Sequence, residues 1–275
     1  VELAQAFRRF GSAVTVLETG ARLLGREDAH VGDAVRAILE EEGIQVVPDA
    51  ETQAVEGRSG DRVRLQVETR SGEQTIEGSD ILVAAGRTPN TPDIGLDAAA
   101  IALDERGFIQ VDDRLQTTAA GVWALGECAG SPQFTHVAFD DFRVVRDNLA
   151  GKSRSTRDRL VPYCAFIDPE LARVGLDETT AQQRGLDVRV ARVAMSSVLR
   201  ARAMVETRGF MKMLLEPVSD RVLGFTMLGP SAGEVLAVVQ TAMLGGLPFT
   251  TLRDAIFTHP TMAEGLNVLL TTGLG

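Results

Sequence analysis

The chain has 275 residues, of which 44% are hydrophobic, and a formal net charge of −10 at pH 7. This length and apolar content suffice for one large or two modest domains and exclude an intrinsically disordered chain. The acidic balance, without a basic cluster, argues against a nucleic-acid partner. No apolar run approaches the length of a membrane span, so we expect no membrane partner either.

The two cysteines, Cys128 and Cys164, are far apart in the sequence, with no CxxC motif and no zinc-type spacing. They predict neither a disulfide framework nor a metal site. We interpret them as small core residues of a protein in a reducing, cytoplasmic compartment.

The N-terminal stretch VELAQAFRRFG is typical of a helix already under way at Val1, with no methionine, signal peptide or capping residue before it. Four apolar residues share one stripe of this helix: Leu3, Ala6, Phe7 and Phe10. Gly11 is a natural C-terminal cap. We therefore expect the natural polypeptide to begin upstream, with its targeting signal undetermined.

The first part of the chain alternates predicted helices and strands, which indicates a parallel α/β unit followed by an antiparallel meander. In order, we expect a buried strand over 12–18, an amphipathic helix over 29–42 closed by Gly43, a strand over 44–47, alternating strands within 51–80, and a strand over 80–86 that enters a Gly/Pro turn at 86–90.

Residues 121–151 predict a strand, a glycine-rich loop and a helix that begins near Thr135 or His136. Such a helix N-terminus can bind a polar or anionic group, although an ordinary strand–loop–helix junction has the same pattern. The polar stretch 151–159 is typical of a domain boundary. Beyond it the pattern is α+β: a helix at 177–184, strands near 188–195, 209–216 and 221–229, and a helix at 231–244.

Two short helices are predicted at the C-terminus. Thr251 and Asp254 resemble a capping box for a helix over 252–257, and Pro260 can occupy the first position of the last helix. His259 would then lie just outside that helix, with Glu264 in its first turn. A carboxylate that orients a histidine makes an acid–base unit, but a His-Pro pair at a helix entry is more often a plain boundary than a site.

Several stretches together resemble the C-terminal part of the class I pyridine nucleotide–disulfide oxidoreductases, the flavoproteins that include glutathione reductase, lipoamide dehydrogenase and mercuric reductase. In the family's order they are LVAAGRTPN (82–90), GVWALGECAG (121–130), AFIDPELARVGLDE (165–178), RGFMKMLL (208–215), RVLGFTMLGPSAGEVL (221–236) and HPTMAEGLN (259–267).

The resemblance implies the remainder of a Rossmann-like NAD(P)H-binding domain over 1–87, the C-terminal part of an FAD-binding domain over 88–158, and an α+β interface domain over 159–275 that forms a homodimer. The fold class would be α/β combined with α+β. Family members carry two GxGxxG motifs and a redox cysteine pair upstream, and neither occurs in this sequence. We therefore expect a C-terminal fragment of a longer enzyme.

The resemblance also assigns site residues. Those implied for FAD are Gly86, Arg87, Gly126, Glu127, His136, Val137 and Ala138. Glu127 stands where the family usually has Asp on the ribityl chain, and it is one methylene longer. Residues 136–138 would aim N–H groups at the flavin, with His136 a shape and hydrogen-bond residue. His259 would be the acid–base residue oriented by Glu264, acting on the other subunit.

Glu18 bears on the choice of nicotinamide cofactor. A carboxylate at the end of the second strand of a dinucleotide fold accepts hydrogen bonds from ribose hydroxyls and repels the 2′-phosphate of NADP, which favours NAD(H). Arg22 and Arg26 are near in sequence and could instead pair with that phosphate. A solvated strand end is the alternative for Glu18.

The predicted function is electron transfer from NAD(P)H through FAD to a cysteine pair and then to a disulfide or related small-molecule acceptor. Residues 200–213 and 261–266 are most similar to the mercuric reductase branch, yet that enzyme has Tyr at the position of His259 and a C-terminal cysteine pair, both of which differ here. The alternatives are an inactive dimerisation module, a metal-ion reductase, or an NADH oxidase or transhydrogenase without the disulfide.

Overall fold

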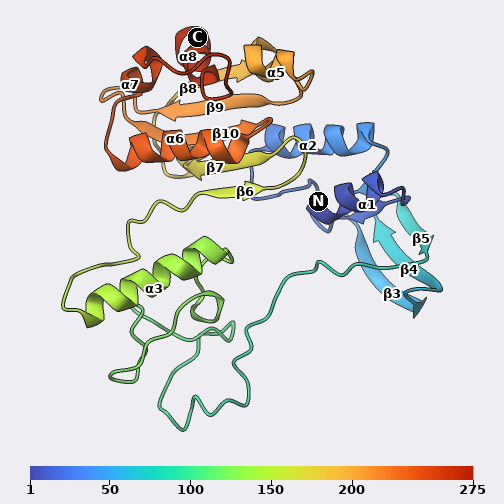
Figure 1. Cartoon of the computed structure of the whole chain (residues 1–275). Coiled ribbons are helices and arrows are strands. Elements are labelled where there is room, and N and C mark those ends of the chain that lie inside the picture. The colour runs from blue at the N-terminus through green and yellow to red at the C-terminus, as the bar shows by residue number, and fades with distance from the viewer. Residues whose placement is uncertain (275) are drawn as a thin grey trace. The chain divides into compact units, whose positions relative to one another are not determined.

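The computed structural model of the protein describes residues 1–274, which form two compact units. Unit 1 combines Val1–Leu82 with the chain from Pro162 onward, and unit 2 is Val83–Val161. In Figure 1, unit 1 therefore contains both the blue N-terminal and the orange-red C-terminal elements. Mixed α/β and α+β architecture is confirmed; the division into three domains at 87 and 158 stays a prediction.

Unit 1 begins with the predicted parallel α/β arrangement. Its elements are α1 (Glu2–Arg9), β1 (Thr15–Leu17), α2 (Ala29–Glu41) and β2 (Gln45–Val47). β1 and β2 pair in parallel, with Val16 opposite Val46. Gly43 follows α2 at φ +83°, a conformation open to glycine, so the helix ends where the sequence predicts.

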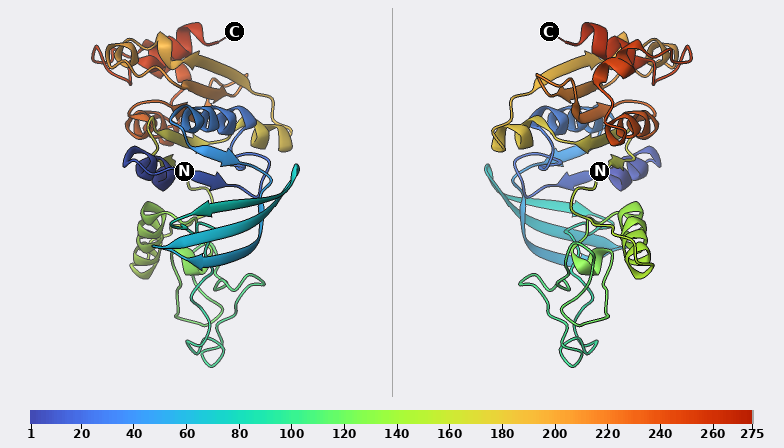
Figure 2. Two further views of the ribbon diagram at one scale, coloured as in Figure 1. Left: turned by 90° about the vertical axis from the view of Figure 1, so that its right-hand side faces the viewer. Right: turned by 90° about the vertical axis from the view of Figure 1, so that its left-hand side faces the viewer.

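The meander predicted within 51–80 is confirmed as a three-stranded antiparallel sheet. Its strands are β3 (Glu51–Arg58), β4 (Arg62–Thr69) and β5 (Gly72–Gly78), in the order β3-β4-β5. The strands lie side by side as a twisted ribbon in Figure 2. Alternation in β4 buries Val63, Leu65 and Val67 on one face, which is why this segment forms a strand.

The C-terminal part of unit 1 is a five-stranded antiparallel sheet with helices. The strands, in the order β6-β7-β10-β9-β8, are β6 (Tyr163–Ala165), β7 (Leu171–Gly175), β8 (Arg189–Ala194), β9 (Phe210–Leu215) and β10 (Val222–Leu228). The helices are α4 (Glu178–Gln183), α5 (Leu199–Ala203), α6 (Ala232–Leu244), α7 (Phe249–Asp254) and α8 (Gly265–Thr272).

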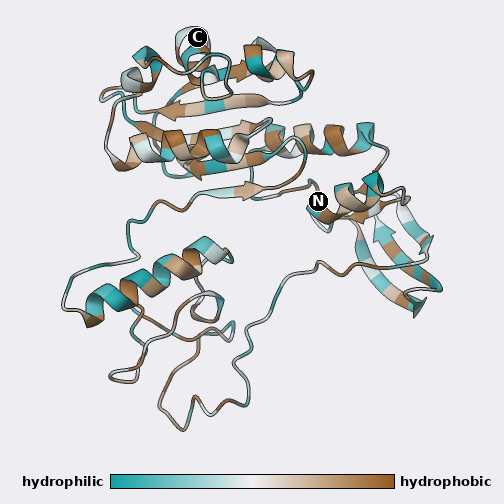
Figure 3. Cartoon of the chain, viewed as in Figure 1, coloured by the Kyte–Doolittle hydropathy of each residue, from teal (hydrophilic) through white to brown (hydrophobic). Residues whose placement is uncertain are grey.

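Both faces of this sheet are covered. On one face, α6 packs on β7 and β10, and α8 packs on β8 and β9 (Figure 1). On the other face, Leu171, Phe210 and Leu228 pack with residues of α2. Every residue of β9 is consequently buried, and the strand is mostly hydrophobic in Figure 3. The α+β pattern predicted beyond residue 159 is confirmed.

The apolar stripe of α1 does not face the core. Leu3, Phe7 and Phe10 are 54%, 48% and 82% exposed, whereas Gln5 is 3% exposed. The Gln5 amide donates to the Asp168 carbonyl and accepts from the Asp168 N–H, both at 2.7 Å. Periodicity shows which residues share a face, but here two backbone hydrogen bonds decide which face turns inward.

The two sequence-distant parts of unit 1 share one hydrophobic core. Residues from α2 and its flanks pack with residues from the C-terminal sheet in a single cluster that includes Leu23, Val31, Val35, Leu39, Ile167, Leu171, Phe210 and Leu228. Burial of this apolar surface is the main favourable term that holds the two parts together.

A buried charged contact crosses the same junction. Lys212, in the middle of β9, is 0% exposed, and its ammonium donates to Asp28 and, at 2.8 Å, to Glu178. The Asp28 carboxylate also accepts from the N–H groups of Glu178 (3.1 Å) and Thr179 (2.9 Å) and from the Thr179 hydroxyl (2.6 Å). Asp28, at the start of α2, thus caps α4.

The ionisation of Asp28 reflects these donors. Burial by itself works to raise the pKa of Asp28, but the hydrogen bonds from Lys212 and Thr179 outweigh it and hold the pKa far below its ordinary value. The buried lysine therefore faces a carboxylate that stays ionised at every physiological pH.

The pKa of Glu27, the residue before Asp28, is shifted in the opposite direction. The Tyr163 hydroxyl donates to its carboxylate, and Arg173 Nε is 3.2 Å from Oε2, while Arg173 also pairs with Asp177. Burial raises the pKa of Glu27 to about 6 from an ordinary value of 4.5, although Arg173 acts against that rise. The folded state therefore retains a proton on Glu27 that the unfolded state releases.

Glu27 is expected to make the protein less stable as pH rises. Its folded pKa is raised, so its contribution is fully present below pH 4.5 and is lost as pH rises through about 6. The free energy of unfolding should fall by about 2 kcal/mol over this pH range in the wild-type protein. Glu27→Gln, which cannot titrate, should not show this fall. Urea unfolding of both proteins at pH 4, 5, 6 and 7 measures it; parallel pH profiles for the two proteins would contradict the assignment.

Unit 2 contains the helix α3 (Thr135–Leu149) and the short 3₁₀ turn η1 (Glu127–Ala129). The helix starts at the predicted position. The core of unit 2 is small and includes the buried residues Ile109, Leu115 and Val144. Isolated bridges such as Gln116–Trp123 replace the strand predicted before the glycine-rich loop.

The strand predicted over 80–86 is also wrong. These residues have no regular structure, and Leu82 and Val83 are 58% and 78% exposed. A strand needs neighbours that pair its N–H and C=O groups, and none of the described strands pairs with this segment; the Ile81 N–H donates instead to the Ser59 hydroxyl at 3.0 Å. Hydrophobic composition alone cannot supply that partner. Among the described residues, no helix has the length and apolar character required to cross a membrane.

Candidate functional site

His259 and Glu264 lie together at the start of the last helix of unit 1. His259 Nδ1 is 2.9 Å from both Oε1 and Oε2 of Glu264. This hydrogen bond places the carboxylate on Nδ1 and leaves Nε2 on the other edge of the ring. The His259 side chain is 60% exposed and that of Glu264 27%. The pair therefore presents an oriented imidazole at the surface of this chain.

The local backbone that builds this pair differs from the prediction. α8 begins at Gly265, with Glu264 at its N-cap position, so Pro260 is outside the helix rather than at its first residue. The turn between is closed by Thr261, whose hydroxyl donates to the Thr258 carbonyl at 2.8 Å and accepts from the Glu264 N–H at 3.3 Å. The predicted spacing brings His and Glu together through a turn, not through a helix.

The preceding helix was also misplaced. α7 spans Phe249–Asp254 instead of 252–257, and its N-terminus has no side-chain cap, so Thr251 and Asp254 lie inside it. Phe249 and Leu252 are buried, which shows that packing determines the position of this helix. The Asn267 side chain from α8 then donates to the carbonyls of Leu252, Arg253 and Ala255 and satisfies its C-terminal end.

Three predicted flavin-side residues meet in unit 2. Arg87 donates to Glu127 Oε1 at 3.0 Å, and Gly126 immediately precedes Glu127. Gly126 has φ +75° and ψ −154°, a conformation that residues with a Cβ rarely adopt. Gly86 likewise has φ +105°. The two glycines are needed for the course of the backbone on either side of the Arg87–Glu127 ion pair.

The other three predicted residues open α3. His136 is exposed and its ring stacks on Phe134, with centroids 5.2 Å apart. Val137 is buried, and Ala138 packs within 3.5 Å of the position a Cβ on Gly126 would take. The N–H groups of Val137 and Ala138 donate to the Phe134 carbonyl, so a flavin at this position would share them with that carbonyl.

These features fit the FAD segment of a dinucleotide-binding fold. The turn at Gly126 lies beside the helix start, since a Cβ on this glycine would be 3.5 Å from Ala138 Cβ, and no side chain of the N-cap residue Phe134 caps α3. An uncapped helix N-terminus beside a glycine turn suits a polar or anionic cofactor group. Glu127 and Arg87 are the charged side chains at hand for the cofactor's hydroxyl and phosphate groups.

Glu18 lies directly after β1 in unit 1. Its carboxylate accepts from the Gly20 N–H at 2.8 Å, which holds it within the loop that follows the strand. Arg22 is 3.3 Å from Asp33, an exposed pair, so its guanidinium is directed to α2. Glu18 thus occupies the strand-end position from which the sequence predicts a contact with ribose.

The buried acids and bases within the two units are not predicted from the sequence. In unit 1, Asp28, His30 and Glu178 offer ligand atoms within 4.8 Å of one another, a spacing compatible with a metal ion. The Lys212 ammonium already bonds both carboxylates, so the cation of this cluster is the lysine itself. A lone lysine within FMKMLL was the available signal, since a charge in an apolar strand requires a partner.

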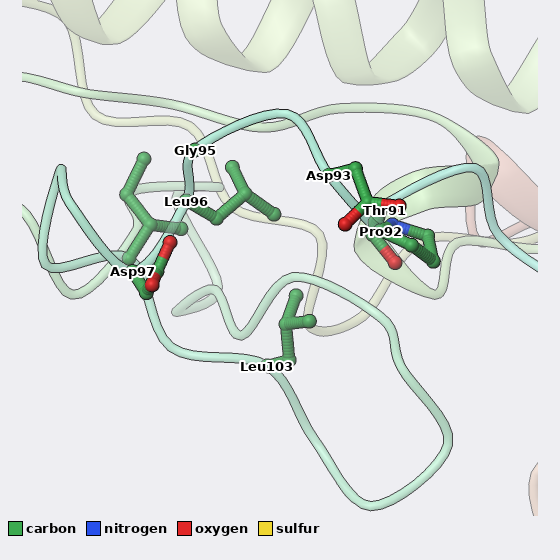
Figure 4. Close-up of a pocket in the computed structure, with 8 residues that line it drawn as sticks. Thr91, Pro92, Asp93, Gly95, Leu96, Asp97 and Leu103 are labelled. Atoms are coloured by element: carbon green, nitrogen blue, oxygen red, sulfur yellow. The ribbon is translucent and has the colours of Figure 1, made fainter.

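Other features carry no predicted chemistry. The pocket in Figure 4, of about 360 Å³, is formed by the loop from Thr91 to Leu103, and none of its lining residues was predicted as a site residue. Cys128 and Cys164 are free and partly exposed, not fully buried in the core as expected. Burial nevertheless raises the pKa of the Cys164 thiol to about 12, which keeps it protonated.

Known proteins match this chain along nearly its whole length. Residues 1–141 match the pyridine nucleotide-disulphide oxidoreductase family model, and residues 161–269 match the dimerisation domain of the same family. A probable pyridine nucleotide-disulfide oxidoreductase, RclA of Escherichia coli strain K12, is 40% identical over 271 residues, 98% of this chain and 60% of the relative. Its solved structure superposes with a TM-score of 0.89, covering 98% of this chain and 61% of that one.

Two further relatives have different assigned activities. A dihydrolipoyl dehydrogenase of Thermus scotoductus is 36% identical, covering 97% of this chain and 58% of the relative. A mercuric reductase of Acidithiobacillus ferrooxidans is 34% identical, covering 99% and 49%. The chain thus spans about half to three-fifths of the length of these relatives. Given both family models and these identities, the chain belongs to the pyridine nucleotide-disulfide oxidoreductase family.

Proposed function

We propose that the chain is part of a flavoenzyme that passes electrons from NAD(H) through FAD to a cysteine pair outside the present sequence, and on to a disulfide or related acceptor. The observation that carries this proposal is the His259–Glu264 pair, with Nδ1 held at 2.9 Å and the ring 60% exposed. When bound, FAD supplies the two-electron chemistry; the residues of this chain bind, orient and move protons.

The role proposed for His259 is proton transfer at a thiol. Glu264 holds the ring in one tautomer, with the proton on Nδ1, so that Nε2 can accept a proton from a thiol or return one. Among the described residues no cysteine is hydrogen-bonded to His259. We propose that the thiols it serves belong to a second copy of the chain, joined through the dimerisation domain matched over 161–269.

NAD(H) is proposed as the electron donor in preference to NADP(H). Glu18 lies at the end of β1, where its carboxylate would accept a hydrogen bond from a ribose hydroxyl and would repel a phosphate. The nearby Arg22 is 3.3 Å from Asp33, so it is already partnered. This arrangement supports the choice that the sequence favours.

A metal-ion acceptor is the second candidate. It is favoured by the similarity to mercuric reductases and by a solved Cu(II) complex of the HOCl-induced flavoprotein disulfide reductase RclA of Escherichia coli, which has a TM-score of 0.89 to this chain. Soft metal ions prefer thiolate ligands, and the two cysteines of this sequence, Cys128 and Cys164, form no pair. A histidine at position 259 suits thiol–disulfide interchange better, so the disulfide acceptor is preferred.

Anaerobic half-reactions of the holoprotein test the proposal. NADH is expected to bleach the flavin absorbance with a higher kcat/KM than NADPH, and a small disulfide is expected to restore the absorbance rapidly. Cu(II) and Hg(II) are offered as acceptors in parallel. A protein that binds no flavin, or whose reduced flavin ignores disulfides, would refute the main proposal; a clear NADPH preference would overturn the role of Glu18 alone.

A further inference from the structure

Asp141, in α3 of unit 2, is a fully buried carboxylate, with 0% exposure. A charge without solvent is costly unless hydrogen bonds and an opposite charge compensate it. Neither the predicted chemistry nor the Arg87–Glu127 pair uses this residue. Its partners therefore indicate what the protein gains from the burial.

Directly and through Arg159, Asp141 reaches both ends of one loop, residues 126–131. The Gly126 N–H donates to Asp141 Oδ2 at 2.8 Å, and Oδ1 pairs with the guanidinium of Arg159. Arg159 also donates to the Ser131 hydroxyl at 3.4 Å. The Asp141–Arg159 ion pair thus binds the first and last residues of the loop, and the Arg159 side chain is only 17% exposed.

The other backbone hydrogen bonds of the loop do not use the Gly126 N–H. Ala129 N–H and Ser131 N–H donate to the Gly126 carbonyl at 3.1 and 3.3 Å, Gly130 N–H donates to the Glu127 carbonyl at 3.0 Å, and Ile109 N–H donates to the Cys128 carbonyl at 2.8 Å. Asp141 is the acceptor of the Gly126 N–H. Gly126 has no Cβ, so its backbone can adopt many conformations, including the observed φ +75° and ψ −154°. Without an external anchor, this glycine would sample several conformations, and the direction of Glu127 would vary with it.

We propose that Asp141 and Arg159 are positioning residues for the flavin: they hold loop 126–131 in the conformation that presents Glu127 and the Gly126 backbone to FAD. This inference rests on the proposal that the loop binds FAD. A loop that is already ordered in the folded protein binds FAD more tightly, because binding then does not have to order it. Loss of the ion pair should therefore weaken flavin affinity even in a folded protein.

The test compares Asp141→Asn with Asp147→Asn in the holoprotein. Asp147 is also an ion-paired acid of α3, 2.9 Å from Arg146, but it has no hydrogen bond to loop 126–131 among the described residues. After removal of the cofactor, FAD is titrated back by fluorescence at a temperature where circular dichroism shows every variant folded. Asp141→Asn is expected to raise the FAD dissociation constant roughly tenfold or more, and Asp147→Asn to leave it unchanged.

Arg159 supplies a second, independent arm. Arg159→Gln should weaken FAD binding in the same direction, whereas Arg157→Gln, which removes an exposed pair with Asp113, should not. In the double variant Asp141→Asn/Arg159→Gln the losses should be less than additive, because both changes break one ion pair. If Asp141→Asn does not fold, the comparison of Arg159→Gln with Arg157→Gln decides.

Amide hydrogen exchange at Gly126 separates positioning from general stability. Faster exchange at Gly126 with unchanged exchange in the middle of α3 is expected for both Asp141→Asn and Arg159→Gln. Unaltered FAD affinity in folded variants would overturn this inference and leave the proposed function intact. Absence of flavin binding by the wild-type protein would instead count against the proposed function.

Discussion

Replacing His259 by alanine is expected to slow reduction of the disulfide acceptor by about 10²–10⁴-fold, while reduction of the flavin by NADH keeps its rate. In the proposed function, Glu264 holds the imidazole through Nδ1 and Nε2 exchanges protons with a thiol. Hydride transfer from the nicotinamide needs no such proton transfer. Stopped-flow measurement of each half-reaction in the holoprotein separates the two effects.

Two companion variants sharpen this prediction. Glu264→Gln retains a hydrogen-bonding side chain but removes the charge that stabilises the imidazolium, so it should cause a smaller loss in the same half-reaction. Thr258→Ala, beside His259, removes an exposed side chain whose residue takes part in the turn only through its carbonyl, and should have no effect. Equal losses in both half-reactions for His259→Ala would rule out acid–base work at the thiols.

Replacing Lys212 by methionine is expected to lower the free energy of unfolding by about 3–5 kcal/mol. Lys212 is 0% exposed, and its ammonium compensates Asp28, which is 4% exposed. Without the lysine, the Asp28 carboxylate keeps its N–H donors from α4 but remains buried without a cation. The loss falls on the junction between α2 and the five-stranded sheet.

Urea unfolding followed by circular dichroism measures this effect, with Lys152→Met as the matched control. Lys152 is the chain's other lysine. Its side chain is 70% exposed, and its Nζ is 4.0 Å from the Asp147 carboxylate, which is a weak surface contact. Its loss should therefore change the free energy of unfolding by less than about 0.5 kcal/mol. Adding Asp28→Asn to Lys212→Met should restore part of the loss, because the uncompensated charge is then removed. Equal stabilities for the two single lysine variants would show that the buried ion pair is not an important constraint.

Many elements were predictable because their cause is local. β4 alternates buried and exposed residues, the apolar stripe of α2 ends at Gly43, and His259 and Glu264 are close enough in sequence for any tight turn to bring them together. The predicted parallel pairing of β1 with β2 also follows from the order of elements.

The misplaced elements have non-local causes. Residues 80–86 have the composition of a strand but pair with none of the described strands, and α1 turns its polar Gln5 inward because the Asp168 backbone accepts and donates there. Neither the missing strand partner nor the contact with Asp168 could be identified from the neighbouring sequence. Likewise the last two helices shift from their predicted bounds because buried Phe249 and the Thr261 turn determine where they begin.

The class of fold, the order of most helices and strands, and the candidate acid–base pair could be predicted from the sequence, since these depend on periodicity, turn residues and short spacing. Which charges are buried together is visible only in the folded chain. Asp28 lies 184 positions from Lys212, and Asp141 acquires a role through Gly126 and Arg159. A buried charge is stabilised by whichever opposite charge and donors the folded chain brings within hydrogen-bond distance, and that proximity is a property of packing, not of local sequence.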